Sequence, residues 1–319
     1  MISKDIVLGL FFLFQTGLGV LGNSFLLGLY TIPIFTGTRM RPINMLLTHL
    51  AFVNNLVLLS KGIPHTMSAL GLTNFLDDVG CKLIFYFHKV ARDLSLCTTC
   101  LLSSFQVITL SPGNFWWAKL KAKSSKCIAR LFLLFWTFHL LRNGMNLALM
   151  KGPLGNKNIT EEQDYIYCAV LFPTSLIIAV HILIVFLPDL LCIGIMLGAS
   201  GYMVFFLYRH HQRVQYIHSN SLTPNISPKT RVTQTILLLV ILFVSFNSLN
   251  SILMLCIQNG RCSWQIHTSA FLASCFPACS SFILIVSDSR VYNNFLALRE
   301  KMIQLRCNLG NSPKTHQND

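Results

Sequence analysis

Seven apolar stretches of about 20 residues, separated by polar connections, constrain the fold of this chain most strongly. Such a stretch crosses a bilayer as a helix, because backbone polar groups in lipid must be hydrogen-bonded within their own segment. We therefore predict an all-α membrane protein, with residues 1–319 forming a single seven-helix domain. The predicted spans are 6–32, 43–63, 83–110, 128–150, 183–208, 235–257 and 268–287, and residues 288–319 form the predicted tail.

Composition excludes a soluble domain. Of the 319 residues, 53% are hydrophobic and only 11% are charged, whereas soluble domains carry roughly 25% charged residues. A core of this size cannot absorb so much apolar surface, so the excess must face lipid. The first stretch resembles a signal peptide in position, but it is long and lacks a clear small-residue cleavage site. We predict that it is the first transmembrane helix.

The positions of the basic residues predict the orientation. The net charge of +14 would suggest nucleic acid as a partner of a soluble chain. Here 16 of the 25 Lys and Arg residues fall in the tail and in the loops after spans 1, 3 and 5. Because Lys and Arg favour cytoplasmic loops, we expect the amino terminus outside the plasma membrane and the carboxyl terminus in the cytoplasm. The bilayer, and no nucleic acid, is then the partner of this chain.

The same rule bears on two ambiguous regions. Apolar character runs from Ala169 to Tyr208, which is long for one helix and tight for two. Opposite sides for the two termini require an odd number of spans, which favours one helix. The tract Lys119 to Lys126 is predicted as a cytoplasmic loop, with Trp116 and Trp117 at the membrane interface.

Two sequence marks belong to the outer side in this topology. Asn158 starts an Asn-Ile-Thr glycosylation site in the long loop after span 4, whereas the similar site at Asn225 falls on the inner side. Cys81 and Cys168 both lie at the oxidising outer side, so we predict a disulfide between them. Cys97 and Cys100 lie within a span and pair with no second Cys-x-x-Cys, so no metal site is predicted.

Charged residues within spans are the candidates for function, because the membrane makes them costly. His88, Lys89, Arg92 and Asp93 lie in span 3, and Asp189 lies in span 5. Arg92 and Asp189 are at matching depths and can meet, and Lys89 and Asp93 can pair along their helix. We expect these five residues to form the floor of an outward-facing ligand pocket. A purely structural ion pair is the alternative.

Polar residues elsewhere in the spans have a different predicted role. We expect them to form hydrogen bonds between helices, as polar side chains commonly do in membranes. They are Asn23, His49, Asn54, Asn55, Asn247 and Asn250.

The function classes narrow to two. No hydrolase, protease or nucleotide-binding motif occurs in the sequence, so an enzyme is not predicted and no cofactor is expected. A transporter would more often show matching broken helices in two halves, and no such repeat is visible. Ligand-triggered signalling is therefore the first class and transport is the second.

Four segments resemble vomeronasal type-1 receptors, which are pheromone receptors of the G-protein-coupled group. They are Ser60 to Lys123, Ala199 to Ser219, Lys229 to Val240 and Phe276 to Ile285. The resemblance covers nearly the whole chain. It implies a small volatile or steroid-like ligand, an inhibitory heterotrimeric G protein as partner, and the membrane of a sensory neuron. Bitter-taste receptors are the nearest alternative, and the span 3 segment argues against them.

The resemblance also bears on the cytoplasmic side. Gln106 stands 25 residues after Cys81, where rhodopsin-like receptors place the arginine of their acid-arginine-aromatic triplet. We expect a G-protein-facing surface there. After the last span, an amphipathic helix is predicted from Val291 to Leu305, and Cys307 follows as a candidate for lipidation. The residues expected to face the G protein are Gln106, Lys119, Lys121, Lys123, Arg209, Arg213, Lys229 and Arg231.

Overall fold

A computed structural model of the chain describes seven helices and three short strands. The helices are α1 (Lys4–Phe35), α2 (Pro42–Ala69), α3 (Asp78–Leu110), α4 (Phe115–Arg142), α6 (Ser175–Ile217), α7 (Pro228–Asn259) and α8 (Ser263–Ser287). The strands are β1 (Met150–Lys151), β2 (Glu162–Tyr165) and β3 (Cys168–Leu171). The described residues are 4–37, 40–72, 75–111, 115–144, 147, 150–151, 162–165, 168–171, 175–217, 228–259 and 263–288.

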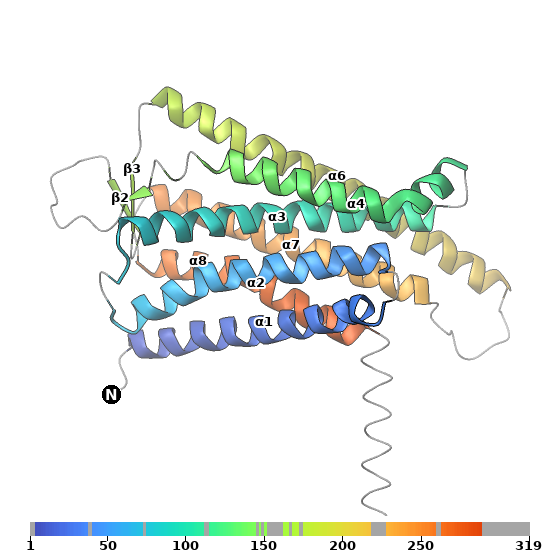
Figure 1. Cartoon of the computed structure of the whole chain (residues 1–319), viewed down its shortest axis with the longest axis horizontal. Helices are drawn as coiled ribbons and strands as arrows, with labels where there is room; N and C mark the ends of the chain where they lie inside the picture. The colour runs from blue at the N-terminus through green and yellow to red at the C-terminus, as the bar shows by residue number, and fades with distance from the viewer. Residues whose placement is uncertain are drawn as a thin grey trace, which may run out of the picture.

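The helices run alongside one another in a bundle, with the sheet and the amino terminus at the same end (Figure 1). We call this the sheet end and the other the opposite end. Helix α3 lies at the centre and packs against α2, α4, α6 and α7. It is also the most buried of the apolar helices, with 67% of its apolar window covered, against 17% for α6. Polar residues on α3 are therefore the ones with most opportunity to meet other helices.

Six of the described helices are long and apolar enough to cross a membrane. They match the predicted spans 1, 2, 3, 5, 6 and 7 within a few residues at most ends. Helix α4 is not among the six, because its first half carries several basic residues. Its 28 residues nevertheless extend about 42 Å, more than the roughly 30 Å of a bilayer core. The six spans are Ile6–Phe35, Pro42–Ala69, Asp78–Leu110, Phe186–Arg209, Thr230–Leu253 and His267–Ser287.

The predicted limits of span 4 are wrong. Helix α4 begins at Phe115, so the tract Lys119 to Lys126 is helical and not a loop. Lys, Ala and Leu are good helix formers, which allows the helix to extend beyond the apolar part. The helix ends at Arg142, and Asn143 follows as a turn residue. Met150, the last residue of the predicted span, belongs to β1.

The ambiguous fifth region contains a single helix, which follows strand β3. Helix α6 continues from Ser175 to Ile217 through Pro188, and its 43 residues extend about 65 Å. It starts earlier and ends later than the predicted span. Membrane helices tolerate an internal proline where local adjustments satisfy the backbone groups that it frees. The predicted tail helix, Val291 to Leu305, and the glycosylation site at Asn158 lie outside the described residues.

A three-stranded antiparallel sheet connects α4 to α6, in the order β1-β3-β2. Cys168 of β3 pairs with Tyr165 of β2, and Ala169 pairs with both Asp164 and Lys151. These strands were not predicted from the sequence, because segments of two to four residues are far shorter than a membrane span of about 20.

Five of the six polar residues predicted to join helices do so. Asn54 of α2 donates to Ser280 Oγ on α8 at 3.0 Å and accepts from Ser95 Oγ on α3 at 2.8 Å. Asn23, Asn55, Asn250 and His49 also bond to neighbouring helices. Asn247 is the exception, since its amide donates to Phe243 O within α7.

His49 joins three helices. Trp136 Nε1 of α4 donates to His49 Nε2 at 2.9 Å, so that ring nitrogen carries no proton. His49 Nδ1 then carries the proton and donates it to Thr98 Oγ1 of α3, 2.8 Å away. The ring also stacks on Phe132 of α4 at a centroid distance of 4.0 Å. A neutral histidine with both nitrogens bonded suits a position inside the bundle.

Close packing of α1 depends on small residues. A Cβ atom added to Gly62 of α2 would collide with the side chain of Thr16 on α1, and one added to Gly19 would lie 2.7 Å from Leu58 Cδ1. In contrast, a Cβ atom at Gly28 of α1 meets nothing within 4 Å. Small residues let helix backbones approach one another in membranes, where packing drives association.

These contacts give a first prediction. Gly62→Ala forces α1 away from α2, and overpacking of this kind costs about 1–3 kcal/mol. We expect a lower midpoint of thermal unfolding in detergent and reduced surface expression. Gly28→Ala is the matched control and should be neutral or slightly stabilising, because alanine is the better helix former. Equal stability of the two variants would contradict the packing described here.

Candidate ligand-binding site

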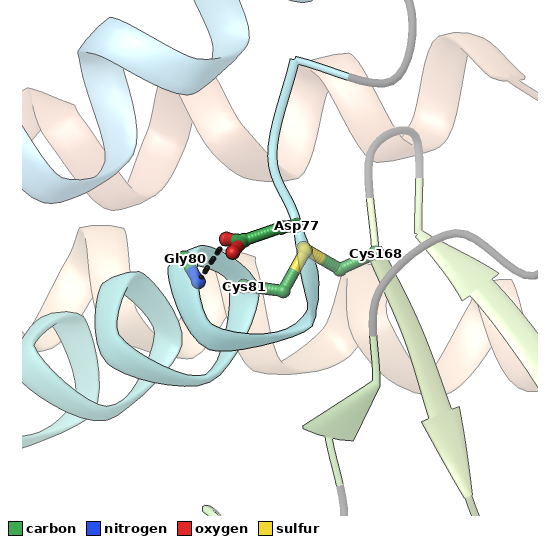
Figure 2. The surroundings of a disulfide bond; sticks show 4 residues. All are labelled: Asp77, Gly80, Cys81 and Cys168. Carbon is green, nitrogen blue, oxygen red and sulfur yellow. Dashed lines mark hydrogen bonds between the residues drawn. A yellow bond between two sulfur atoms is a disulfide. The ribbon is translucent and has the colours of Figure 1, made fainter.

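Helix α3 is fixed at the sheet end by a cap and a covalent bond (Figure 2). Asp77 precedes the helix, and its carboxylate accepts from Gly80 N at 2.7 Å, which satisfies one of the unpaired N–H groups of the first turn. Cys81 forms a disulfide with Cys168 of β3, the pair that the sequence predicts, with Cα atoms 5.9 Å apart. The sheet is therefore attached to the first turn of α3.

Two aspartates and two arginines meet inside the bundle, and we call them the acid–arginine cluster. Arg92 and Asp93 come from α3, Arg142 from the end of α4, and Asp189 from α6. Arg142 forms hydrogen bonds to Asp93 and, at 3.4 Å, to Asp189. The carboxylate of Asp93 also accepts from Asn143 Nδ2 at 2.9 Å. With two charges of each sign, the cluster is balanced.

The two arginines differ in exposure and in contacts. The Arg142 side chain is 2% exposed and bridges both acids. The Arg92 side chain is 30% exposed, and its guanidinium nitrogens lie 3.7 Å from Asp189 and 3.9 Å from Asp93. These distances are too long for hydrogen bonds. Arg142 is therefore the structural partner of the acids, whereas Arg92 keeps its N–H donors available.

One of the two predicted ion pairs forms in the structure. Arg92 and Asp189 do form an ion pair between α3 and α6. Among the described residues, Asp93 pairs with Arg92, Arg142 and His139, so the prediction that it pairs with Lys89 is wrong. Arg142 of α4 binds the Asp93 carboxylate, and Arg142 was not among the predicted site residues. Arg142 lies within the predicted span 128–150, so the rule applied to spans 3 and 5 would have found it.

Further basic residues lie near Arg92. His88 is buried, and its Nδ1 atom lies 3.3 Å from Ser60 Oγ on α2. Lys61 of α2 and Lys89 of α3 interact electrostatically with Arg92. Lys61 is a second intramembrane charge that the sequence analysis did not single out, although it lies in the predicted span 43–63. Basic side chains thus extend from the acid–arginine cluster to Lys61 of α2.

A narrow cavity lies between α2, α3, α7 and α8. Its empty space of about 300 Å³ includes the opening, and its enclosed part has room for about one water molecule. Among the described residues that line it, Arg92 is the one with a charged side chain. Phe243 of α7 and Phe276 of α8, which also line it, contact each other edge to face at 4.7 Å. The lining residues are Val57, Arg92, Ser95, Phe243, Phe246, Asn247, Leu272, Ala273, Phe276 and Pro277.

Three thiols lie deeper in the bundle than the acid–arginine cluster. Cys97 Sγ of α3 lies 3.2 Å from His139 Nε2 and 3.8 Å from Cys192 Sγ of α6. Cys97, Cys100 and Cys192 are all free. No group of three or more His, Cys, Asp or Glu side chains within the described ranges is arranged to hold a metal ion.

At the opposite end of the bundle, a buried hydrogen bond joins α3 to α7. Gln106 Nε2 donates to Thr233 Oγ1 at 2.9 Å, and both residues are buried. Arg231 donates to Val286 O of α8 at 3.4 Å, and Arg209 is exposed on α6. Lys119, Lys121, Lys123, Arg213 and Lys229 lie in helices, but their side chains are not described.

Comparison with known proteins identifies the family. The Vomeronasal organ pheromone receptor family matches residues 6–297 of the chain. Vomeronasal type-1 receptor 1 of Gorilla gorilla gorilla is 43% identical over 295 residues, covering 92% of this chain and 83% of the relative. The chain belongs to the vomeronasal type-1 receptor family. Vomeronasal type-1 receptor 3 of Homo sapiens is 41% identical over 292 residues, covering 91% of this chain and 94% of the relative.

A more distant relative extends the comparison to fish. Olfactory receptor class A-like protein 1 of Danio rerio is 30% identical over 289 residues, covering 89% of this chain and 90% of the relative. Vomeronasal type-1 receptors are chemosensory pheromone receptors of the G-protein-coupled class, so the chain is a multi-pass membrane receptor of this class. Membership of this family favours a signalling function over transport. It also favours a vomeronasal type-1 receptor over a bitter-taste receptor.

The unequal contacts of the two arginines give a second prediction. Arg142→Gln leaves Asp93 and Asp189 without their principal partner, and breaking a buried pair in this way costs about 3–5 kcal/mol. We expect a marked fall in the thermal midpoint of the detergent-solubilised receptor. The double variant Arg142→Gln with Asp93→Asn should be less destabilised, because it removes one of the stranded charges.

Lys82→Gln provides the control for this experiment. It breaks the exposed pair between Lys82 and Asp78 at the start of α3, and exposed pairs contribute at most about 1 kcal/mol. If Arg142→Gln lowered the midpoint no more than Lys82→Gln, Arg142 would not be the structural partner of the acids.

Proposed function

We propose that the chain is a plasma-membrane pheromone receptor that binds a small volatile or steroid-like ligand and activates an inhibitory heterotrimeric G protein. The observation that carries this proposal is the cavity between α2, α3, α7 and α8, in which one charged side chain, Arg92, projects among aromatic and aliphatic ones. Pockets for small molecules have this character, with a mostly apolar wall and a few polar groups that orient the ligand. No enzymatic step forms part of the proposal.

The predicted pocket residues have different roles in this proposal. Arg92 contacts the ligand, while Asp93 and Asp189 position Arg92 from behind. His88 and Lys89 are outside the cavity wall and shape the surrounding charge. The cavity is narrow, so a ligand must separate side chains of α7 and α8 from α3. A ligand that favours the separated arrangement shifts the receptor toward it.

We propose that the sheet end faces the outside of the cell. The Cys81–Cys168 disulfide supports this orientation, because such bonds persist in oxidising compartments. The opposite end carries Arg209, Arg213, Lys229 and Arg231 near the ends of α6 and α7, and basic residues favour the cytoplasmic side. The amino terminus is then outside and the carboxyl terminus inside.

Glycosylation tests this orientation. Asn158 lies between α4 and α6 on the proposed outer side, whereas Asn225 lies between α6 and α7 on the proposed inner side. Treatment of the expressed chain with a glycosidase should reduce its apparent mass, and Asn158→Gln should abolish that change. Asn225→Gln is the matched control and should leave it intact. The reverse result would place the sheet end in the cytoplasm.

The contact between Gln106 and Thr233 suggests how the inner end is held at rest. It joins α3 to the start of α7, close to Lys229 and Arg231, which we propose face the G protein together with Lys119, Lys121, Lys123, Arg209 and Arg213. Movement of α7 away from α3 would break this hydrogen bond. We propose that it stabilises the resting state of the receptor.

The function is tested in cells that contain an inhibitory G protein and a cyclic-nucleotide reporter. A library of urinary volatiles and steroid-like compounds should contain members that lower the cyclic AMP signal, and only in cells expressing the chain. Thr233→Val should raise ligand-free signalling about fivefold, because one lost hydrogen bond is worth about 1 kcal/mol. Thr235→Val, which removes only a bond to Arg231 O within α7, is the control.

Two results would contradict these proposals. Unchanged basal signalling in a well-expressed Thr233→Val receptor would show that the Gln106 contact does not hold the resting state. Ligand-dependent flux through vesicles containing the purified chain, without any G-protein response in cells, would favour the transport class instead.

A further inference from the structure

We propose that Cys97 of α3 and Cys192 of α6 form a redox-active thiol pair, which hydrogen peroxide oxidises to a disulfide that joins the two helices. This modification site goes beyond the proposed function, because its chemistry needs neither the ligand nor the G protein. The proposal is carried by the distance between the two sulfur atoms, by the histidine beside Cys97, and by the different exposure of the two thiols.

The two sulfur atoms are already close. Cys97 Sγ lies 3.8 Å from Cys192 Sγ, and both residues are free thiols. A disulfide bond is about 2.05 Å long, so the sulfur atoms must approach each other by less than about 2 Å. Rotation of a cysteine side chain about its Cα–Cβ bond moves the sulfur over a distance of this order. The bond can therefore form between the helices as they stand.

His139 of α4 can act as a base for Cys97. Its Nε2 atom lies 3.2 Å from Cys97 Sγ, and its Nδ1 atom lies 3.8 Å from a carboxylate oxygen of Asp93. The negative charge of Asp93 favours the tautomer with its proton on Nδ1, and in this tautomer Nε2 can accept the thiol proton. A thiol, a histidine and an acid in this order are typical of activated cysteine nucleophiles.

The two thiols differ in access. Cys192 is half-buried, whereas the relative exposure of Cys97 is 7%. Hydrogen peroxide is small and uncharged, so it can reach a half-buried thiol within a membrane protein. Because exposure is one of the properties that decide which thiol is oxidised, Cys192 reacts first and Cys97 second.

The reaction has two balanced steps. In the first, Cys192 Sγ attacks one oxygen of the peroxide, the O–O bond breaks, and the leaving hydroxide takes the thiol proton to form water. The product is a sulfenic acid at Cys192. In the second, Cys97 gives its proton to His139 Nε2, and its sulfur attacks Cys192 Sγ so that the S–O bond breaks. The departing hydroxide takes the proton from His139, and the two thiols have together lost two electrons to the peroxide.

Cys100 is the competing partner for Cys192. It lies three residues beyond Cys97 on α3, and its thiol also contacts Cys192. Its other side-chain contact is Ser104, whose hydroxyl is far too weak a base to accept the thiol proton. Because the base adjoins Cys97, the geometry favours Cys97 as the attacking thiol.

The bond would change how α3 and α6 are joined. These helices are also connected by the ion pair between Arg92 and Asp189, about one turn of α3 from Cys97. An ion pair can separate and re-form, whereas a disulfide holds until it is reduced. Oxidation would therefore fix α6 against α3 at this level of the bundle.

The test uses the purified full-length receptor in lipid nanodiscs. It is treated with hydrogen peroxide, its remaining thiols are blocked with N-ethylmaleimide in denaturant, and the digest is analysed by mass spectrometry. We expect a peptide pair linked through Cys97 and Cys192 and the loss of maleimide from both residues, with both thiols restored by dithiothreitol. Cys275 is the internal control, because it is also buried but accepts a hydrogen bond from Gln15, and its labelling should not change.

Three variants identify the roles of the residues. Cys97→Ser should abolish the linked peptides and leave a sulfenic acid at Cys192 that dimedone traps. Cys100→Ser is the matched control and should form the linked peptides as the unmodified sequence does. His139→Gln should slow formation of the bond about 100-fold, the low end of the effect of a general base. A merely structural role of His139 would lower the thermal midpoint without changing this rate.

The proposal is overturned if Cys97 and Cys192 keep their maleimide labels at a peroxide concentration that oxidises the exposed thiol of Cys127. A bond from Cys192 to Cys100 in place of Cys97 would also overturn it, and an unchanged rate in His139→Gln would remove the histidine from the mechanism. If a variant does not fold, the peptides of the unmodified sequence still decide whether the bond forms. None of these measurements depends on ligand or G protein, so they stand even if the proposed function fails.

Discussion

Charge neutralisation inside an apolar bundle is the constraint on which this structure depends. Asp93 lies near the middle of α3, where an uncompensated carboxylate would be very costly. Arg142 provides the compensation from the end of α4 and also binds Asp189 of α6. Three helices are thereby brought to one point, although α4 is the least apolar of the bundle. A helix that crosses a membrane with several basic residues benefits from a fixed partner of opposite charge.

Because Arg142 binds both Asp93 and Asp189, the second arginine of the cluster, Arg92, is in a different position. Arg92 adjoins Asp93 in sequence but has fewer and longer contacts, and it alone of the acid–arginine cluster reaches the cavity. The same cluster therefore joins α3, α4 and α6 through ion pairs and, through Arg92, adjoins the cavity that α7 and α8 line. At the opposite end of the bundle, a buried neutral hydrogen bond joins α3 to α7 in addition to their packing contacts. The ion pairs that join α3 to α4 and α6 thus lie nearer the sheet end than the hydrogen bond between Gln106 and Thr233.

The sequence predicts the helices well because apolar length is a local property. The spans containing Leu50, Leu94 and Leu239 could be recognised without knowledge of their neighbours, and the disulfide followed from the predicted sidedness. The partner of Asp93 could not be recognised in this way. Lys89 is suitably spaced along the helix, but the choice of Arg142 depends on where α4 approaches α3, which is a property of packing. Arg142 itself was within reach of the rule for intramembrane charges.

The disulfide also bears on the order of events during synthesis. Cys81 and Cys168 are separated by 87 positions, and the whole of α4 lies between them. At a translation rate of about 5–20 residues per second, Cys168 is added some 4–17 seconds after Cys81. During that interval Cys168 has not yet been added to the chain, and in the proposed orientation the bond can close only after α4 has crossed the membrane. A closed bridge is thus a chemical record that the central part of the chain was inserted with the correct topology.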